Sequence, residues 1–289
     1  MIELRGKAVA DSLKGTMKAF LDQVDELNRP KLAIVRVGER PDDLAYERMV
    51  LKNCGAIGLP VQVEAMSEAV STEELIKTIE SLNEDVTVQG ILMFRPLPKH
   101  IDEQSVIEAV SVEKDVDCMN PKNLQLRMVS DERAIAPCTP EAVMRILEHY
   151  GYELEGKNVV IVNRSTVIGR PLAIMMMEKN ATVTICHSKT RNLAEITSRA
   201  DIVVTGVGKA RFFGPEYFNE NSIVIDIGIN FDEKGSCGDV DYEAVAAKVA
   251  GITPVPGGVG TVTSSVLLST CCRRRFKGEL RCLSKRRKN

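Results

Sequence analysis

A regular alternation of short β-branched runs with segments of helical spacing is the feature that most constrains the fold. In the first half of the chain, the runs at residues 31–37, 61–66 and 88–94 are predicted to be strands. Helix caps and helical spacing fill the intervals at 42–58 and 71–84. Parallel strands need crossover connections of this kind, so the alternation predicts βαβ units and a parallel sheet.

A second series of predicted strands follows a predicted helix at 138–151. The strands are expected at 158–163, 181–187, 201–208 and 222–230. These runs are continuously apolar, which is typical of parallel strands that are covered on both faces. The chain of 289 residues is long enough for two domains with separate cores.

The helix at 138–151 is expected to connect the two domains. A final helix from about Val259 to Arg275 is expected to return the chain to the first domain. We therefore predict one domain made of residues 1–139 and 262–289, and a second made of residues 140–261.

Composition excludes several classes of protein. Apolar residues make up 44% of the chain and charged residues 27%, and no apolar run approaches the roughly 20 residues that span a bilayer. The N-terminus is charged from its third residue and has no apolar signal segment, so a cytoplasmic protein without membrane contact is expected. Eight scattered cysteines without a C-x-x-C pair, and three histidines, predict reduced thiols and no metal site.

The C-terminal end of the sequence is strongly basic. From Arg273 onward, nine lysines and arginines accompany one acidic residue, Glu279, so the rest of the chain carries a net charge of −10 although the whole carries −2. Such a tail either binds nucleic acid or an anionic membrane, or is solvated and partly disordered. Because Phe276 is its one aromatic residue and the remaining chain is acidic, we favour the solvated tail and expect no nucleic-acid partner.

The segment 158–180 reads as strand, tight turn and helix, the arrangement in which a Rossmann-type fold holds a pyrophosphate at a helix N-terminus. Its turn lacks the G-x-G-x-x-G fingerprint and offers Asn163, Arg164, Ser165 and Gly169. Asn163 is expected to adopt a left-handed conformation, which asparagine tolerates. Arg164 can pair with a ribose 2′-phosphate and therefore favours NADP over NAD.

A polar cluster follows the next predicted strand. The Ser188 hydroxyl can add a donor to the same phosphate, while His187 and Lys189 raise the local positive potential. The cluster also suits a plain helix start capped by Ser188 or Thr190, and the two interpretations are compatible. We predict an α/β fold of two α/β lobes with a cleft between them, the second lobe being a Rossmann-type NAD(P)-binding parallel sheet.

A proline-glycine turn, ITPVPGGVGTVT, occupies residues 252–263. Gly257, Gly258 and Gly260 leave a backbone free of side chains, which a planar ligand or a phosphate can approach closely. The alternative is a loop that only reverses the chain.

In order and spacing, these segments resemble the bifunctional methylenetetrahydrofolate dehydrogenase/methenyltetrahydrofolate cyclohydrolase family. The matching stretches, over about residues 1–270, are SLNEDVTVQGILM, EKDVD, PCTP, NRSTVIGRP, ATVTICHSKT, DIVVTGVG, IVIDIGIN, GDVDY and ITPVPGGVGTVT. The resemblance implies NADP-dependent oxidation of 5,10-methylenetetrahydrofolate to 5,10-methenyltetrahydrofolate, followed by hydrolysis to 10-formyltetrahydrofolate. It also implies tetrahydrofolate one-carbon derivatives as substrates and a homodimer.

The resemblance also implies a set of site residues. Tyr46 corresponds to the family tyrosine that flanks the pterin, and Asp117 to the aspartate that hydrogen-bonds the pterin ring, and both are expected to serve catalysis. The loop that closes over the folate corresponds to Pro256, Gly257, Gly258, Val259 and Gly260. The positions that hold the cofactor correspond to Asn163, Arg164, Ser165, Ser188 and Ile229.

Two substrate-binding positions depart from the family pattern. The family places a lysine four residues after the tyrosine and holds it with a glutamine before the Pro-Leu-Pro turn, but this chain has Val50 and Phe94 there. Lys52, at plus six, lies about 240° around a helix of about 3.6 residues per turn and faces elsewhere. Hydride transfer needs orientation above all, whereas hydrolysis needs proton transfer.

The sequence therefore favours a dehydrogenase with weak or absent cyclohydrolase activity. Two alternatives stay open. One is a fully bifunctional enzyme that uses a displaced group or a water chain, and the other is a non-catalytic NADP- or folate-binding regulatory or subunit protein.

Overall fold

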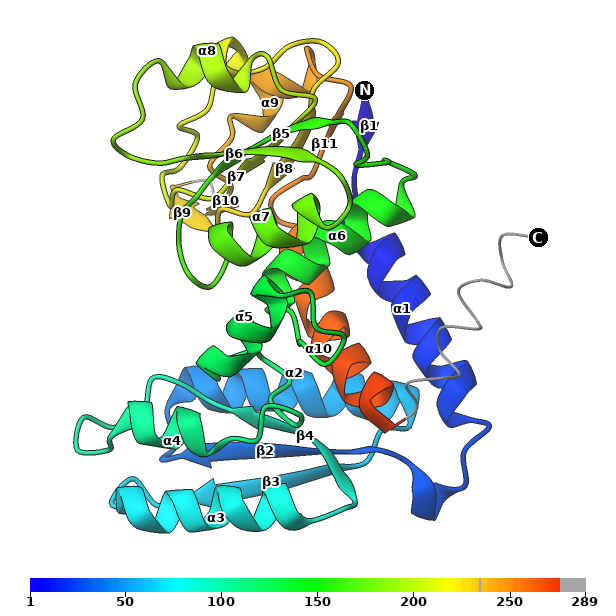
Figure 1. Cartoon of the computed structure of the whole chain (residues 1–289), viewed down its shortest axis with the longest axis vertical. Helices are drawn as coiled ribbons and strands as arrows, with labels where there is room; N and C mark the ends of the chain where they lie inside the picture. The colour runs from blue at the N-terminus through cyan, green and yellow to red at the C-terminus, as the bar shows by residue number, and fades with distance from the viewer. Residues whose placement is uncertain (234, 276–289) are drawn as a thin grey trace. The chain divides into compact units, whose positions relative to one another are not determined.

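The computed structural model of the chain describes residues 1–233 and 235–275. They form two compact units, each with its own parallel sheet (Figure 1). The large-sheet unit contains Met1–Asp11 and Ala136–Ser264, and the small-sheet unit contains Ser12–Ile135 and the chain from Ser265. The basic tail was predicted from Arg273 onward, and the part of it after Arg275 lies outside the described residues.

The small-sheet unit is built from βαβ units, as predicted. Its three parallel strands lie in the order β3-β2-β4. The elements are most of α1 (Gly6–Leu21), η1 (Glu26–Asn28), β2 (Lys31–Val37), α2 (Pro41–Ile57), β3 (Val61–Met66), α3 (Thr72–Glu84), β4 (Val88–Met93), α4 (Glu103–Ala109) and α5 (Pro121–Met128), with the second part of α10 (Val259–Arg275).

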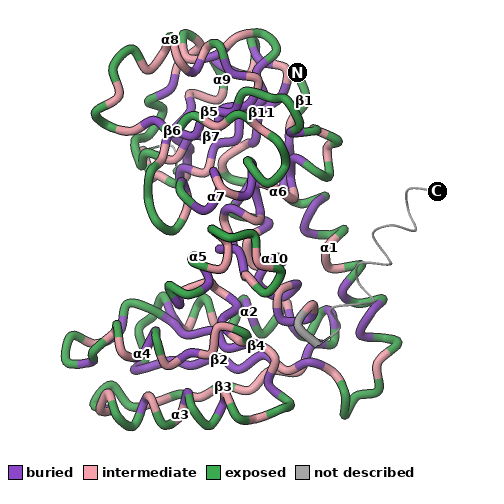
Figure 2. The backbone as a smooth tube through the Cα atoms, viewed as in Figure 1, coloured by how far each residue is buried: buried purple, intermediate pink, exposed green. Residues whose placement is uncertain are grey.

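Helices cover both faces of this sheet, which is why β2 is buried along nearly its whole length (Figure 2). Side chains of α3 and α4 share one apolar core with those of β2 and β4. On β4, a Cβ added to Gly90 would lie 3.1 Å from the Cys271 sulfur of α10, so this glycine admits the helix. A capping box between Ser71 and Glu74 fixes the start of α3.

The large-sheet unit has the predicted Rossmann-type parallel sheet, in the strand order β1-β11-β8-β7-β5-β6. Its first elements are β1 (Ile2–Glu3), α6 (Cys138–His149), β5 (Asn158–Val162), α7 (Gly169–Met177), β6 (Thr182–Cys186), α8 (Leu193–Thr197) and β7 (Ile202–Thr205). They are followed by η2 (Pro215–Tyr217), β8 (Ile223–Asp226), β9 (Asn230–Asp232), β10 (Gly235–Cys237), α9 (Tyr242–Ala246), β11 (Gly251–Ile252) and the first part of α10.

Two features of this unit differ from the sequence expectation. The first eleven residues were expected with the other domain, but β1 pairs in parallel with β11 and joins the large sheet. The strand expected over 222–230 ends at Asp226, and Asn230 begins an antiparallel pair, β9 with β10.

Three findings on the described residues concern membrane spans, metal sites and cysteines. Within residues 1–233 and 235–275, no helix is long and apolar enough to cross a bilayer. The same residues contain no cluster of three or more side chains suited to hold a metal ion. Seven cysteines in this part of the chain are free thiols, and six of them are buried.

Candidate active site

Tyr46 and Phe94 come together in the small-sheet unit at the carboxyl ends of two neighbouring strands. Tyr46 lies on α2, which follows β2, and Phe94 directly follows β4. Their ring centroids are 5.2 Å apart with the planes tilted by 53°. Tyr46 keeps 38% of its surface exposed while Phe94 keeps 5%, so the tyrosine presents a ring face backed by an aromatic neighbour.

Val50 lies one helical turn after Tyr46 and is buried, with Cys54 and Ile57 further along the same face of α2. Lys52 is exposed. The corner around Tyr46 is therefore apolar at both positions where the family resemblance expects a lysine and a glutamine.

A buried ion pair lies beside this corner, and sequence reasoning missed it. Arg36 of β2 places its Nε 2.8 Å from Oε2 of Glu47, the residue after Tyr46, and it also donates to the Gly38 carbonyl oxygen. The two side chains are only 8% and 14% exposed. Its signal in the sequence was an arginine near the end of a mostly apolar predicted strand.

Asp117 lies near the same end of the sheet, because the chain just before it pairs with the edge of β4. The backbone at Asp115 bridges in parallel to Ile91 of β4, so Asp117 lies further along the direction in which Phe94 follows Ile91. Asp117 is half-buried, and the next residue, Cys118, has a left-handed φ of 56°. The Cys118 thiol donates to the Ile135 carbonyl oxygen at 3.2 Å.

Asp115 fixes this loop and was also missed. Its buried carboxylate accepts hydrogen bonds from the Asn120 backbone at 2.8 Å and from the Asn123 side chain at 3.0 Å. Burial raises the pKa of Asp115, against the effect of these hydrogen bonds. The residue orders the chain on either side of Asp117.

In the large-sheet unit, the turn between β5 and α7 is shaped by Asn163. The prediction of a left-handed Asn163 was wrong, because this residue is not among the described residues with positive φ. The Asn163 side chain holds the turn by hydrogen bonds. Its Oδ1 accepts from the backbone N–H groups of Ser165 at 2.9 Å and Gly169 at 3.1 Å, and its Nδ2 donates to the Gly206 carbonyl oxygen at 2.6 Å. A Cβ on Gly169 would overlap the Asn163 backbone, so glycine permits this tight approach.

The remaining cofactor candidates of this unit have exposed side chains. Arg164 and Ser165 project from the β5–α7 turn, Ser188 follows β6, and Ile229 is 63% exposed after β8. Ser188 and Thr190 do not cap α8, since Asn192 occupies the N-cap position without a side-chain cap. The Thr190 hydroxyl instead accepts from the His187 backbone N–H at 2.8 Å and closes a turn after β6.

The proline-glycine loop also lies in the large-sheet unit. Gly257 has a φ of 107°, which only glycine adopts freely, and its carbonyl oxygen accepts from the Gly6 backbone at 2.8 Å. A Cβ on Gly260 would lie 3.8 Å from Cδ1 of Ile229. The glycine end of this loop is therefore adjacent to one of the predicted cofactor contacts.

Asp226, at the end of β8, is a buried carboxyl group with an altered pKa. It is 2% exposed and accepts from the Gly228 and Val240 backbone N–H groups at 2.9 and 2.8 Å. Burial raises its pKa to about 6, and the nearby Asp239 adds to the increase.

This shift predicts a pH dependence of stability. The folded chain holds the Asp226 proton more tightly than the unfolded chain, so the group stabilises the fold most below about pH 4, and that contribution is lost as the pH rises through about 6. We expect the free energy of unfolding of the natural protein, relative to Asp226→Asn, to fall by about 2 kcal/mol between about pH 4 and pH 7. Denaturant titrations of both proteins measure this difference, and a difference that stays constant with pH would contradict it.

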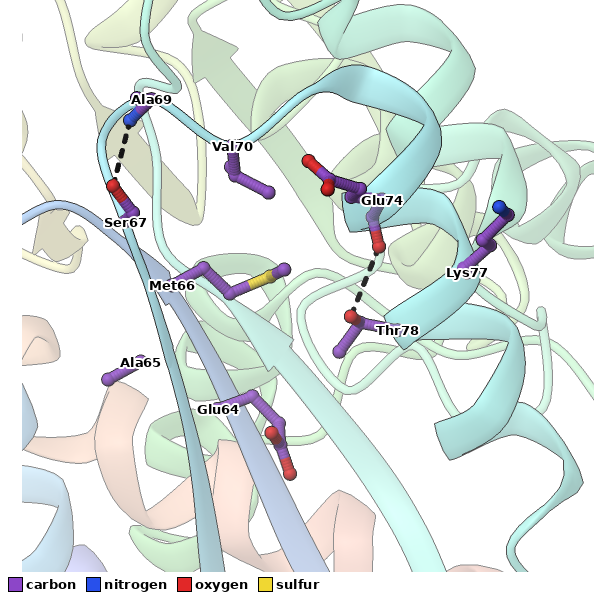
Figure 3. A pocket seen from close by; sticks show the side chains of 9 residues that line it. All are labelled: Glu64, Ala65, Met66, Ser67, Ala69, Val70, Glu74, Lys77 and Thr78. Carbon is purple, nitrogen blue, oxygen red and sulfur yellow. Dashed lines mark hydrogen bonds between the residues drawn. The ribbon is translucent and has the colours of Figure 1, made fainter.

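A surface groove of about 630 Å³ lies elsewhere, between β3 and α3 (Figure 3). Glu64 and Met66 line it from the strand, and Glu74 and Lys77 from the helix. None of the described residues that line this groove is a predicted site residue.

Comparison with known proteins places these features in a family. Residues 4–117 match the model of the tetrahydrofolate dehydrogenase/cyclohydrolase catalytic domain, and residues 137–277 match that of the NAD(P)-binding domain of the same family. The bifunctional protein FolD of Clostridium botulinum is 51% identical over 92% of this chain and 95% of its own length.

Two solved structures have the same fold over nearly their whole length. The bifunctional FolD enzyme of Campylobacter jejuni aligns with a TM-score of 0.89 at 37% identity, covering 96% of this chain and 99% of that one. The Trypanosoma brucei methylenetetrahydrofolate dehydrogenase-cyclohydrolase, solved with NADP and an inhibitor, aligns with a TM-score of 0.84 at 33% identity, covering 97% and 99%. The chain thus belongs to the tetrahydrofolate dehydrogenase/cyclohydrolase family.

Proposed function

We propose that the protein is an NADP-dependent methylenetetrahydrofolate dehydrogenase that oxidises 5,10-methylenetetrahydrofolate and does not hydrolyse the 5,10-methenyl product. Family membership and the NADP complex of the Trypanosoma brucei relative support the oxidation. The observation that carries the second part is the apolar corner of Tyr46, Val50 and Phe94.

The large-sheet unit has the features that NADP requires. Asn163 shapes a tight turn before the N-terminus of α7, where the positive end of the helix dipole favours a pyrophosphate. Arg164 projects a guanidinium group suited to the 2′-phosphate, and in the described part of the chain it has no ion-pair partner. Ser165 and Ser188 add hydroxyl groups, and Ile229 adds an apolar contact. When bound, NADP supplies the acceptor for a hydride.

The folate contacts come from the small-sheet residues and from the proline-glycine loop. We propose that the ring of Tyr46 packs against the pterin, with Phe94 and Val50 behind it, and that the Asp117 carboxylate binds the pterin by hydrogen bonds. Pro256, Gly257, Gly258, Val259 and Gly260 are proposed to contact the folate through a backbone with little side-chain cover. These residues bind and orient the substrate, which is what hydride transfer needs most.

Hydrolysis needs more from the protein. Water must attack the methenyl carbon while a side chain accepts and returns protons, a contribution of about 10² to 10⁴ in rate. Val50 and Phe94 carry no titratable group, and Glu47 is held in its ion pair with Arg36. The corner therefore lacks a group placed for proton transfer at the family positions.

The name of the Clostridium botulinum relative, a bifunctional protein, favours a second candidate function. In it, a displaced group or a water chain performs the hydrolysis. We also propose that the small-sheet unit is the folate-binding domain and the large-sheet unit the NADP-binding domain. The protein is further proposed to be a cytoplasmic homodimer, and its free thiols suit a reducing compartment.

Two assays of the natural protein test the proposal. We expect NADPH to form from 5,10-methylenetetrahydrofolate, and supplied 5,10-methenyltetrahydrofolate to hydrolyse at the rate seen in buffer alone. Rapid hydrolysis would favour the bifunctional candidate. Inactivity in both assays, with NADP still bound, would make the protein a non-catalytic binding protein.

A further inference from the structure

Two buried aspartates interlock with two glycines at the carboxyl end of the large sheet. Asp226 ends β8, and Asp239 lies two residues after β10. A Cβ added to Gly228 would overlap the Asp239 carboxyl group, and a Cβ added to Gly238 would overlap the Asp226 carboxyl group. Each carboxyl group thus occupies space that a glycine leaves open, which joins the segment after β8 to the segment after β10.

The Asp239 carboxylate holds a third segment, the loop after β7. Its Oδ2 accepts from the backbone N–H groups of Val207 and Gly208, the latter at 3.1 Å. Its Oδ1 accepts from the Lys209 backbone at 2.9 Å and from Nδ2 of Asn230 at 2.8 Å. Asp239 is fully buried, so these four donors replace water around its charge.

These hydrogen bonds connect the proposed cofactor contacts to one another. Asn163, which shapes the β5–α7 turn, donates to the carbonyl oxygen of Gly206, the residue before the loop that Asp239 holds. Asn230, at the other side of Asp239, directly follows Ile229. Loops at the carboxyl ends of parallel strands form the ligand site in Rossmann-type sheets. One carboxylate therefore sets the positions of two segments at this edge of the sheet, the loop after β7 and the chain at Asn230.

We propose that Asp239 is a positioning residue for the cofactor: by holding the loop at 207–209 and Asn230, it fixes the surface against which NADP binds. The inference rests on the proposed function in that it takes Asn163 and Ile229 as cofactor contacts. Asp226 differs in its partners, which are Thr205, Gly228 and Val240 and not the loop at 207–209.

The first test measures NADP binding without folate, by titration calorimetry, alongside the KM for NADP. Asp239→Asn replaces an acceptor by an NH2 group that faces N–H donors, and hydrogen bonds to charged groups contribute about 1.5 to 3 kcal/mol. We expect the Kd and KM for NADP to rise about tenfold or more, with the KM for the folate substrate changed less than about twofold. Asn230→Ala removes one donor and should raise the Kd for NADP about threefold.

Asp241→Asn is the matched control. Asp241 lies two residues further along the same segment and caps α9 by accepting from the Ala244 backbone at 3.5 Å. Within the described residues, the Asp241 side chain makes no hydrogen bond to the loop at 207–209, so the Kd for NADP should stay within about twofold of the natural value.

A polarity exchange separates positioning from plain stability. In Asn230→Asp/Asp239→Asn, the new carboxylate at position 230 accepts from the new amide at position 239, so NADP binding should recover relative to Asp239→Asn. Natural Kd and KM values in folded Asp239→Asn and Asn230→Ala would overturn the proposal. If Asp239→Asn does not fold, an unchanged Kd in Asn230→Ala overturns it. If NADP binding weakens as expected but the natural protein does not oxidise 5,10-methylenetetrahydrofolate, the proposed function fails and the role of Asp239 stands.

Discussion

The double variant Val50→Lys/Phe94→Gln is expected to hydrolyse 5,10-methenyltetrahydrofolate at least about a hundred times faster than the natural protein. A positioned acid-base side chain contributes about 10² to 10⁴ in rate, and the substitutions supply one beside Tyr46. Lys at position 50 lies on the same face of α2 as Tyr46, one turn away. The measurement is the rate of loss of supplied 5,10-methenyltetrahydrofolate, with the double variant, with the natural protein and in buffer alone.

The structure gives reasons why the lysine can function there. Val50 and Phe94 are 2% and 5% exposed, so both new side chains are shielded from water, and Gln is smaller than the Phe that it replaces. Burial lowers the pKa of a lysine towards neutrality, where it can accept and return a proton. Glu47, three residues earlier on α2, limits that decrease by its negative charge.

A matched control places the same charge on a different face of the helix. Leu51 is 37% exposed and next to Val50 in sequence, but at plus five it lies about 140° around the helix from Tyr46. Leu51→Lys/Phe94→Gln therefore carries the same two new residue types without a lysine on the face of Tyr46. This control should hydrolyse the substrate no faster than the natural protein. A folded Val50→Lys/Phe94→Gln protein that still forms NADPH but hydrolyses at the natural rate would contradict the prediction.

Local patterns predicted most of the sheet strands but not the pairing of β1 with β11. The strands at 31–37 and 61–66 and the helix from Val259 to Arg275 have the predicted bounds, because each is a continuous pattern within one window of sequence. The pairing of β1 with β11 joins segments about 250 residues apart, and two-residue strands carry no pattern of their own. The end of β8 at Asp226 likewise depends on Val240, a partner from a distant loop.

The candidate site divides in the same way. The meeting of Tyr46 with Phe94 follows from topology, because carboxyl ends of neighbouring parallel strands share one edge. Asn163 was assigned to the right turn with the wrong backbone, since its side-chain bond to Gly206 involves another strand's end. Asp239 was not predicted as a site residue, because its role depends on hydrogen bonds from four donors in two segments that are distant in sequence.

Replacing Arg36 by methionine is expected to lower the free energy of unfolding of the small-sheet unit by about 3 kcal/mol or more. The substitution leaves the Glu47 carboxylate, 14% exposed, without its ion-pair partner, and removing one partner of a buried pair costs about 3 to 5 kcal/mol. Hydrogen exchange at the β2 amides measures the opening free energy of this unit by itself. A local probe is needed because one free energy of unfolding does not describe a chain with two compact units. Arg40→Met is the control: Arg40 pairs with Asp43 at 3.5 Å but is 42% exposed, so the loss should stay below about 1 kcal/mol.

The double variant Arg36→Met/Glu47→Leu distinguishes the value of the pair from the penalty of breaking it. Desolvation of two charges offsets most of their attraction, so an apolar pair of similar volume should recover most of the stability lost in Arg36→Met. The Gly38 carbonyl oxygen loses its Arg36 donor in both variants. This lost hydrogen bond accounts for the stability that the double variant does not recover, about 1 kcal/mol. A double variant as unstable as the single one would contradict this explanation, and would mean that Arg36 acts through its bond to Gly38 rather than through Glu47.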